Sequence, residues 1–281
     1  MQKTIIKKLP RPLRSAAKRT FKVVDILGEQ KLGMLAASVA YYGAIAFFPL
    51  IVVIVAIGGL VLEPEQIDQI AVNMSHVLPS DIASLISTQL QNAMDNKSGN
   101  LMVAVIGFAV AVFGISGVVQ TMITATNAAF EVRDRRNPIK LRFVSIVFTV
   151  GLILGLSVTL PLIFVGGDML LSLGVPDFLA STYTYTRWVV LLILTMWGVA
   201  IFFRYGPDRE RFKLRWLNPG VVFASAGWLT ISAAFFTYLK YFANFNSSYS
   251  LFAGIISLMI WLNLSALIIL IGAAINHTYD T

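Results

Sequence analysis

The sequence predicts an all-α membrane protein that crosses the bilayer six times. Hydrophobic residues make up 57% of the 281 residues and charged residues only 13%, where about 25% charged residues is usual for a soluble domain. The mean hydropathy is +0.77. A spanning helix needs about 20 mostly apolar residues, and six segments qualify or nearly do: 35–62, 101–126, 143–166, 185–203, 221–242 and 251–275. We expect one membrane domain over residues 35–281.

The first 34 residues form a separate basic segment. Beyond Pro10 and Pro12, apolar residues recur at helical spacing from Leu13 to Leu27, with basic residues on the other faces. This pattern predicts an amphipathic helix that lies on the membrane surface. The segment lacks a short apolar core followed by a cleavage site, so it is not typical of a removable signal.

Residues 63–100 separate the first two spans and carry two apolar stripes, one on each side of Pro79. The stripes predict a helical hairpin that caps the outer face by packing on the bundle. A lid that binds a partner is the alternative.

Two spans contain a proline, and one span is weakened by a charge. Pro49 in the first span and Pro161 in the third each remove a backbone donor, so we expect kinks there. Arg187 lies at the edge of the fourth span, where its charged head can extend to the headgroups. All six segments are therefore kept as spans.

The distribution of basic residues predicts the orientation. Of the 22 Lys and Arg residues, 19 precede the first span or lie in the second-to-third and fourth-to-fifth connections. Because basic loops stay in the cytoplasm, both termini should be cytoplasmic. The basic loops also attract anionic headgroups, so membrane lipids, anionic ones above all, are the expected partners, with a homo-oligomer as an open alternative. Nucleic-acid binding is not expected, since no stacking aromatics or recognisable module accompany the basic loop.

The sequence gives no support for an enzyme. The chain has no Cys and only two histidines, His76 and His277, which the predicted topology places on opposite sides of the membrane. The cytoplasmic acids show no metal-ligand spacing, and no GxxxxGK phosphate loop occurs. No catalytic residue, metal or cofactor is therefore expected.

Polar residues inside the spans are the candidate functional positions. Gln120, Thr124, Asn127 and Glu131 are spaced to share one helical face, which leads from the inner half of the membrane to the cytoplasm. They predict either hydrogen bonds between helices or the inner vestibule of a transport path. Arg204 is the expected partner of Glu131. Asn263, near the middle of the sixth span, is expected to bond another helix or to contact a substrate.

Several stretches, taken in order, resemble the BrkB/YihY family of bacterial inner-membrane proteins, historically misnamed ribonuclease BN. They are "LAASVAYYGAIAFFPL", "ATNAAFEVRDRR", "FRYGPDRERFKLRWLNPG" and "WLNLSALIILIGAAINH". The positions that carry the resemblance are Tyr41, Tyr42, Pro49, Arg133, Pro207, Trp216, Pro219, Gly220, Trp261, Gly272 and Asn276. The resemblance implies six helices with both termini inside. Where the family has Gly-Ala-Glu in the last span, this chain has Gly272, Ala273 and Ala274.

Two functions fit these observations. The first is a transporter or a translocator of lipids or other anionic amphiphiles, with the polar stripe as a vestibule that faces the cytoplasm. The second is a scaffold or envelope-integrity factor that transports nothing and acts through protein partners. A continuous polar cavity between the spans would favour the first.

Overall fold

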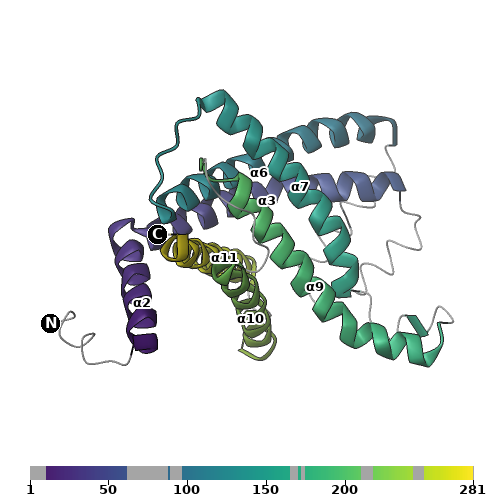
Figure 1. The fold of residues 1–281 in the computed structure, drawn as a ribbon. Helices are drawn as coiled ribbons and strands as arrows, with labels where there is room; N and C mark the ends of the chain where they lie inside the picture. Colours follow the sequence, from purple (N-terminus) through teal and green to yellow (C-terminus); the bar gives the residue numbers. More distant parts are fainter. Residues whose placement is uncertain are drawn as a thin grey trace.

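The computed structural model describes residues 11–61, 88, 97–164, 170–171, 175–209, 218–242 and 250–280, and the elements assigned within them are helices (Figure 1). In chain order they are α2 (Arg11–Glu29), α3 (Leu32–Val61), α6 (Lys97–Ala129), α7 (Pro138–Phe164), α9 (Asp177–Tyr205), α10 (Pro219–Phe242) and α11 (Ser250–Asp280). The predicted hairpin at 63–100 falls mostly outside these residues.

Five of the helices are long and apolar enough to cross a membrane. The apolar stretches are Phe108–Ala129, Pro138–Thr159, Asp177–Tyr205, Pro219–Leu239 and Phe252–Asp280. The predicted first span coincides with α3, a 30-residue helix that contains the shorter apolar stretch Leu32–Phe47. Pro49 and Pro161 both lie inside unbroken helices. A helical membrane protein with several spans is thus confirmed.

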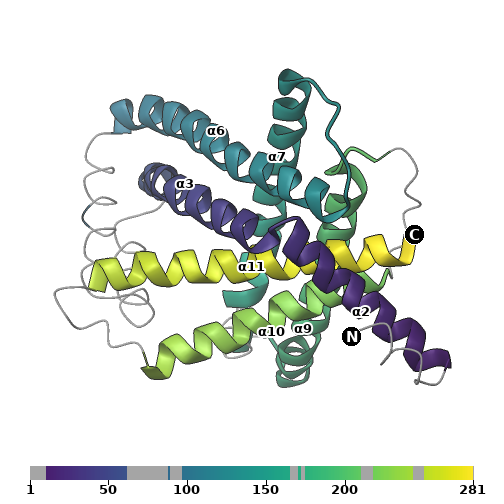
Figure 2. The same ribbon diagram turned by 90° about the vertical axis from the view of Figure 1, so that its left-hand side faces the viewer.

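Helix α3 lies between α6 and α11, and α10 packs along α11 on the side away from α6 (Figure 2). Helix α7 packs on α6, and α9 contacts both α10 and α7. Small side chains let the helices approach closely. The buried alanines of the core are Ala36, Ala125, Ala129, Ala200, Ala224, Ala266, Ala273 and Ala274.

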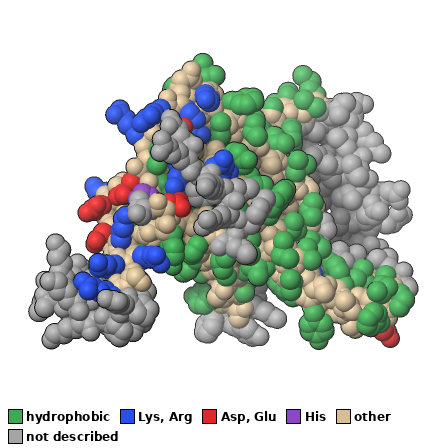
Figure 3. All heavy atoms as spheres, viewed as in Figure 1, with side chains coloured by type: hydrophobic (Ala, Val, Ile, Leu, Met, Phe, Trp, Pro, Cys, Tyr) green, Lys and Arg blue, Asp and Glu red, His purple; other side chains and the backbone are tan. Residues whose placement is uncertain are grey.

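Most of the side chains on the outside of the long helices are apolar, and the charged ones gather at one end. Figure 3 shows Lys, Arg, Asp and Glu side chains concentrated on one side of the molecule, beside a face rich in hydrophobic residues. We call this side the charged end. It comprises α2, the 130–137 connection, residues 206–209 and the last turns of α11. Exposed apolar helix surface of this kind suits hydrocarbon as a solvent.

Helix α2 uses its apolar side against the protein itself. Val23 and Ile26 are buried in the core, and the helix packs on α11 and α3. The Arg19 guanidinium lies 4.0 Å from the ring centre of Tyr279, near the end of α11. The predicted amphipathic helix is therefore present, with part of its apolar stripe covered by two other helices.

Candidate functional site

The four polar residues predicted to line one vestibule differ in exposure and in partners. Asn127 is buried with 3% of its surface exposed, Gln120 is half-buried and Thr124 is exposed. Glu131 lies beyond the end of α6, so the helical spacing on which the prediction depended stops before it. The stripe is replaced by two separate polar clusters.

Helix α6 ends in a Schellman motif, which turns the chain away from the helix axis. Glu131 has φ +54° and donates its N–H to the carbonyl of Ala128 at 2.9 Å, while the N–H of Val132 bonds the carbonyl of Asn127 at 2.9 Å. A glycine is the usual residue at this left-handed position. Because Glu131 is there instead, its side chain leaves the α6 face.

The first cluster, which we call the polar knot, consists of Asn127, Asp134, Arg136 and Asp208. Asn127 Nδ2 donates to Asp134 Oδ2 at 2.9 Å, and Asn127 Oδ1 accepts the backbone N–H of Asp208 at 2.9 Å. The backbone N–H of Arg135 bonds Asp208 Oδ2 at 2.8 Å. One buried side chain on α6 thereby ties together the α6–α7 and α9–α10 connections.

Within the knot, Asp134 and Arg136 form a partly buried ion pair. Arg136 donates to Asp134 through its backbone N–H at 2.9 Å and its Nε at 2.9 Å, both to Oδ1, and through Nη2 to Oδ2 at 2.7 Å. These hydrogen bonds from Arg136, with the further one from Asn127, hold the pKa of Asp134 below its ordinary value of 3.8 against the opposing effect of burial. The carboxylate therefore stays ionised in the folded protein.

The last turns of α11 contact several other parts of the charged end. His277 Nε2 lies 2.9 Å from Glu131 Oε2, and Arg209 Nη2 donates to Asp280 Oδ2 at 2.8 Å. The Arg209 guanidinium also lies 4.1 Å from the ring centre of Phe130. These contacts join the α6–α7 and α9–α10 connections to α11.

The expected pair between Glu131 and Arg204 is replaced by the contact with His277. Arg204 is half-buried in the last turn of α9, where its guanidinium lies 5.7 Å from the ring centre of Tyr205. The physical reason is the left-handed turn at Glu131, which directs that side chain toward α11.

Three positions of the sequence resemblance meet where α10 crosses α11. The N–H of Gly220, which has no partner within its own helix, donates to Asn276 Oδ1 at 2.8 Å. A Cβ atom on Gly272 would lie 2.6 Å from the carbonyl oxygen of Gly220, so only glycine allows this close approach. Pro219 begins α10 at the first helical position. These contacts give the residues of this cluster a structural role at the helix crossing.

The other positions of the resemblance are dispersed. Pro207 is buried in the connection before Asp208, Arg133 is exposed, and Trp261 Nε1 donates to Ser232 Oγ at 3.2 Å. Asn263 is half-buried on α11, with no hydrogen bond to another described residue. Trp216 lies outside the described residues.

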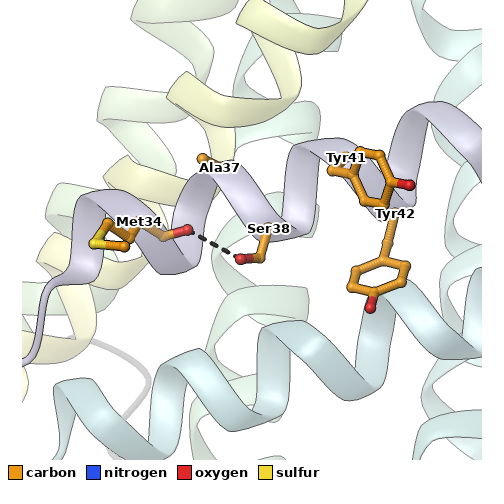
Figure 4. A pocket seen from close by; sticks show the side chains of 5 residues that line it. All are labelled: Met34, Ala37, Ser38, Tyr41 and Tyr42. Atoms are coloured by element: carbon orange, nitrogen blue, oxygen red, sulfur yellow. Dashed lines mark hydrogen bonds between the residues drawn. The ribbon is translucent and has the colours of Figure 1, made fainter.

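Tyr41 and Tyr42 lie on an open groove along α3. Their rings meet edge to face with centroids 5.5 Å apart, and the groove has a volume of about 420 Å³ (Figure 4). Its lining residues are Met34, Ala37, Ser38, Tyr41 and Tyr42, which all belong to α3. With walls from one helix only, the groove does not enclose a ligand.

The second cluster, which we call the polar seam, lies between α6 and α7 around Arg142. Arg142 Nη2 donates to the carbonyl of Phe113 at 2.9 Å, and Nη1 donates to Gln120 Oε1 at 3.3 Å. The guanidinium covers the Phe113 ring at 3.9 Å from its centre. Ser116 Oγ donates to the same carbonyl at 2.7 Å. The polar seam is Ser116, Gln120, Arg142, Ser145 and Thr149.

Ser145 and Thr149 extend the seam along the face of α7 that carries Arg142. They follow Arg142 by three and seven residues, which places all three on one helical face. Both are fully buried, and their hydroxyls donate at 2.8 Å to carbonyls four residues earlier. The inward face of this apolar helix is therefore polar over two turns.

The sequence placed Arg142 in the connection before the third span, and the structure shows that it belongs to the helix. Helix α7 begins at Pro138, five residues before the predicted start of the span, so Arg142 is part of the helix. Gln120 and Phe113 precede the end of α6 by nine and sixteen residues, which corresponds to about 14 Å and 24 Å along the helix. The spacing of Arg142, Ser145 and Thr149 was the signal in the sequence for a polar helix face. It could be used only if the helix was known to begin before Arg142.

Among the described residues, no group of three or more His, Asp or Glu side chains is placed to hold a metal ion. Three acids at the charged end, Asp134, Asp280 and Glu131, are instead paired with Arg136, Arg209 and His277.

Comparison with known proteins agrees with the fold and the motifs. The family model "Virulence factor BrkB" matches residues 23–281. A relative named "Putative ribonuclease-like protein YfkH", from Bacillus subtilis (strain 168), is 28% identical over 244 residues, which cover 85% of this chain and 87% of the relative. No solved structure matches the chain. The chain belongs to the BrkB virulence-factor family.

Proposed function

We propose that the protein moves anionic amphiphiles of the phospholipid class across the bacterial inner membrane, and that Arg142 receives their headgroups. The observation that carries this proposal is the position of the Arg142 guanidinium, which lies against α6 between Phe113 and Gln120 in a strongly apolar part of the molecule. A charge within a membrane span costs free energy unless protein partners offset it, and for that reason it marks a substrate pathway by default.

The chemistry of the polar seam favours a phosphate-bearing headgroup. A guanidinium presents five donors in a planar fork that matches phosphate oxygens. Two of these donors bond the Phe113 carbonyl and Gln120, and both are neutral acceptors that an anionic oxygen would outcompete. Ser145 and Thr149 follow on the same face, and their hydroxyls, which here donate to backbone carbonyls, would become further donors along α7 once they turn toward a headgroup.

The charge distribution supports one orientation of the molecule. Lys and Arg side chains of the described residues gather at the charged end (Figure 3), and the positive-inside bias favours the cytoplasm for this end and for both termini. In this orientation a lipid headgroup reaches Arg142 from the inner leaflet, where the basic residues of the protein attract anionic lipids.

A lipid-translocation assay tests the proposal. The purified protein is reconstituted into phosphatidylcholine vesicles that contain traces of phosphatidylglycerol with a fluorescent label on one acyl chain. Dithionite, which does not cross the bilayer, then bleaches only the labels it can reach. We expect wild-type protein to expose the inner-leaflet label to bleaching, Arg142→Gln to abolish this exposure, and Arg142→Lys to retain part of it.

Lys140→Gln is the matched control, because Lys140 is an exposed basic residue two positions earlier in the same helix. We expect it to translocate as the wild type does. Bleaching equal to that of protein-free vesicles would reject translocation and favour the scaffold function. Equal translocation by wild type and Arg142→Gln would reject the polar seam as the path.

A further inference from the structure

We propose that Arg187 on α9 forms a second binding site for the phosphodiester headgroup of an anionic phospholipid, at the end of α7 remote from Arg142. This inference deepens the proposed function and rests on it for its role in translocation. It concerns the only basic residue within the α9 candidate span apart from Arg204 in its last turn.

The first observation is the face of α9 on which Arg187 lies. Ala180, Thr184, Arg187 and Leu191 are four, three and four residues apart and form one stripe. Ala180 is 2% exposed and Leu191 is 3% exposed, so this stripe is the protein-facing side of the helix. An arginine that served only to anchor the helix at the headgroups would lie on the exposed face, as Trp188 does.

The second observation is the position of Arg187 relative to Arg142. Helices α7 and α9 run antiparallel side by side, since Phe148 stacks edge to face on Phe202 and the Tyr183 hydroxyl lies 3.5 Å from the carbonyl of Leu162. Leu162 follows Arg142 by 20 residues, or about 30 Å. Arg187 is one turn from Tyr183 on the side toward the charged end, which leaves about 25 Å between the two arginines along α7.

That separation is close to the thickness of the hydrocarbon core of a bilayer, about 30 Å. An anionic headgroup that enters at one leaflet and leaves at the other needs a cationic partner near each surface. Arg142 supplies one near the charged end, and Arg187 supplies the other. An arginine far from the charged end also runs against the positive-inside bias. The orientation of the protein in the membrane therefore does not explain why an arginine is present there.

The side chains around Arg187 suit a phosphodiester. Its guanidinium lies 5.4 Å from the ring centre of Trp188, within the range of a cation–π contact. The Thr184 hydroxyl, one turn away on the same stripe, donates to the Ala180 carbonyl at 2.9 Å and would become a donor to a headgroup once it turns away from that carbonyl. The Tyr183 hydroxyl lies on the adjoining edge of the helix, where it donates to the Leu162 carbonyl at 3.5 Å and would have to release that carbonyl to donate to a headgroup.

Photocrosslinking tests this site independently of transport. The protein, reconstituted in phosphatidylcholine vesicles, is exposed to phosphatidylglycerol with a photoactivatable diazirine on its headgroup, and chymotryptic peptides are analysed by mass spectrometry. We expect crosslinks in the α9 segment around residue 187 that unlabelled phosphatidylglycerol suppresses and phosphatidylcholine does not. The Arg187→Gln variant should lose most of these crosslinks, and the Arg187→Lys variant should keep some of them.

The controls separate this inference from the proposed function. Arg204→Gln removes an arginine from the other end of the same helix and should leave the crosslinks unchanged. Arg142→Gln should abolish translocation and keep the Arg187 crosslinks. Crosslinks that persist in Arg187→Gln, or equal competition by phosphatidylcholine in the wild type, would overturn the second site. If wild-type protein crosslinks as expected but translocates nothing, the second site stands and the proposed function fails. Competition in the wild type decides the question even if a variant does not fold.

Discussion

Replacing Asn127 with Leu should destabilise the protein, because Asn127 is the centre of the polar knot. Leu keeps the branching of Asn at Cγ but cannot donate or accept a hydrogen bond, and the position is only 3% exposed, so the lost hydrogen bonds are not replaced by water. The lost interactions are the 2.9 Å bond to the Asp134 carboxylate and the 2.9 Å bond from the Asp208 N–H. A hydrogen bond to a charged group contributes about 1.5–3 kcal/mol and a neutral one about 0.5–1.5 kcal/mol, so we expect a loss of about 2–4 kcal/mol.

The matched control is Thr124→Leu, one turn earlier in α6. Thr124 is exposed, and its hydroxyl bonds only the Gln120 carbonyl within the same helix at 3.0 Å. We expect its effect on the free energy of unfolding to stay within about 0.5 kcal/mol. Both variants are measured by unfolding in mixed detergent micelles, with helical circular dichroism as the signal. An Asn127→Leu variant as stable as Thr124→Leu would refute the knot as a stabilising element.

Three further predictions concern the charged end and the helix crossing. Gly272→Ala should cost about 1–3 kcal/mol in the same unfolding assay, because its Cβ would lie 2.6 Å from the backbone oxygen of Gly220; an unchanged stability would contradict the close crossing. Asp134→Asn should be less stable than wild type at neutral pH, and the difference should vanish as pH falls below 3.8 and through the lowered pKa of the carboxyl; a difference that persists in acid would show that charge is not the cause. Glu131→Gly should be neutral or should stabilise the protein by about 1 kcal/mol. Glycine relieves the strain of the left-handed backbone (φ +54°), and this gain outweighs the loss of a partly exposed ion pair to His277. A loss of stability above about 1 kcal/mol would assign the ion pair a larger role.

The sequence was sufficient for the fold class because the signals for membrane helices are long and redundant. Each span carries about 20 apolar residues, so an error of a few residues at an end leaves the helix count unchanged. The same tolerance explains the errors at the site. The predicted third span began five residues late, which kept Arg142 in a loop and hid the polar face of α7.

Glu131 leaves the predicted polar stripe for a local reason. Helical spacing is evidence only while the helix lasts, and α6 ends at Ala129, two residues before Glu131. A glycine at the left-handed position would have revealed the end of the helix, whereas a glutamate there gives no signal. The contacts of Asn127 were also beyond prediction, because Asp208 lies 81 residues away in the chain. The partner of Glu131, His277, is 146 residues away.

The proposed path through the polar seam makes a direct claim about water access, and the Cys-free chain allows it to be measured. Ser145 is fully buried beside Arg142 in this structure, and Ala125 is equally buried in the apolar core. Single Cys variants at the two positions are reconstituted with phosphatidylglycerol and treated with a charged thiol reagent that does not cross the membrane. If the polar seam opens to pass headgroups, Ser145→Cys is labelled and Ala125→Cys is not. A translocating protein in which Ser145→Cys stays unlabelled would contradict the account.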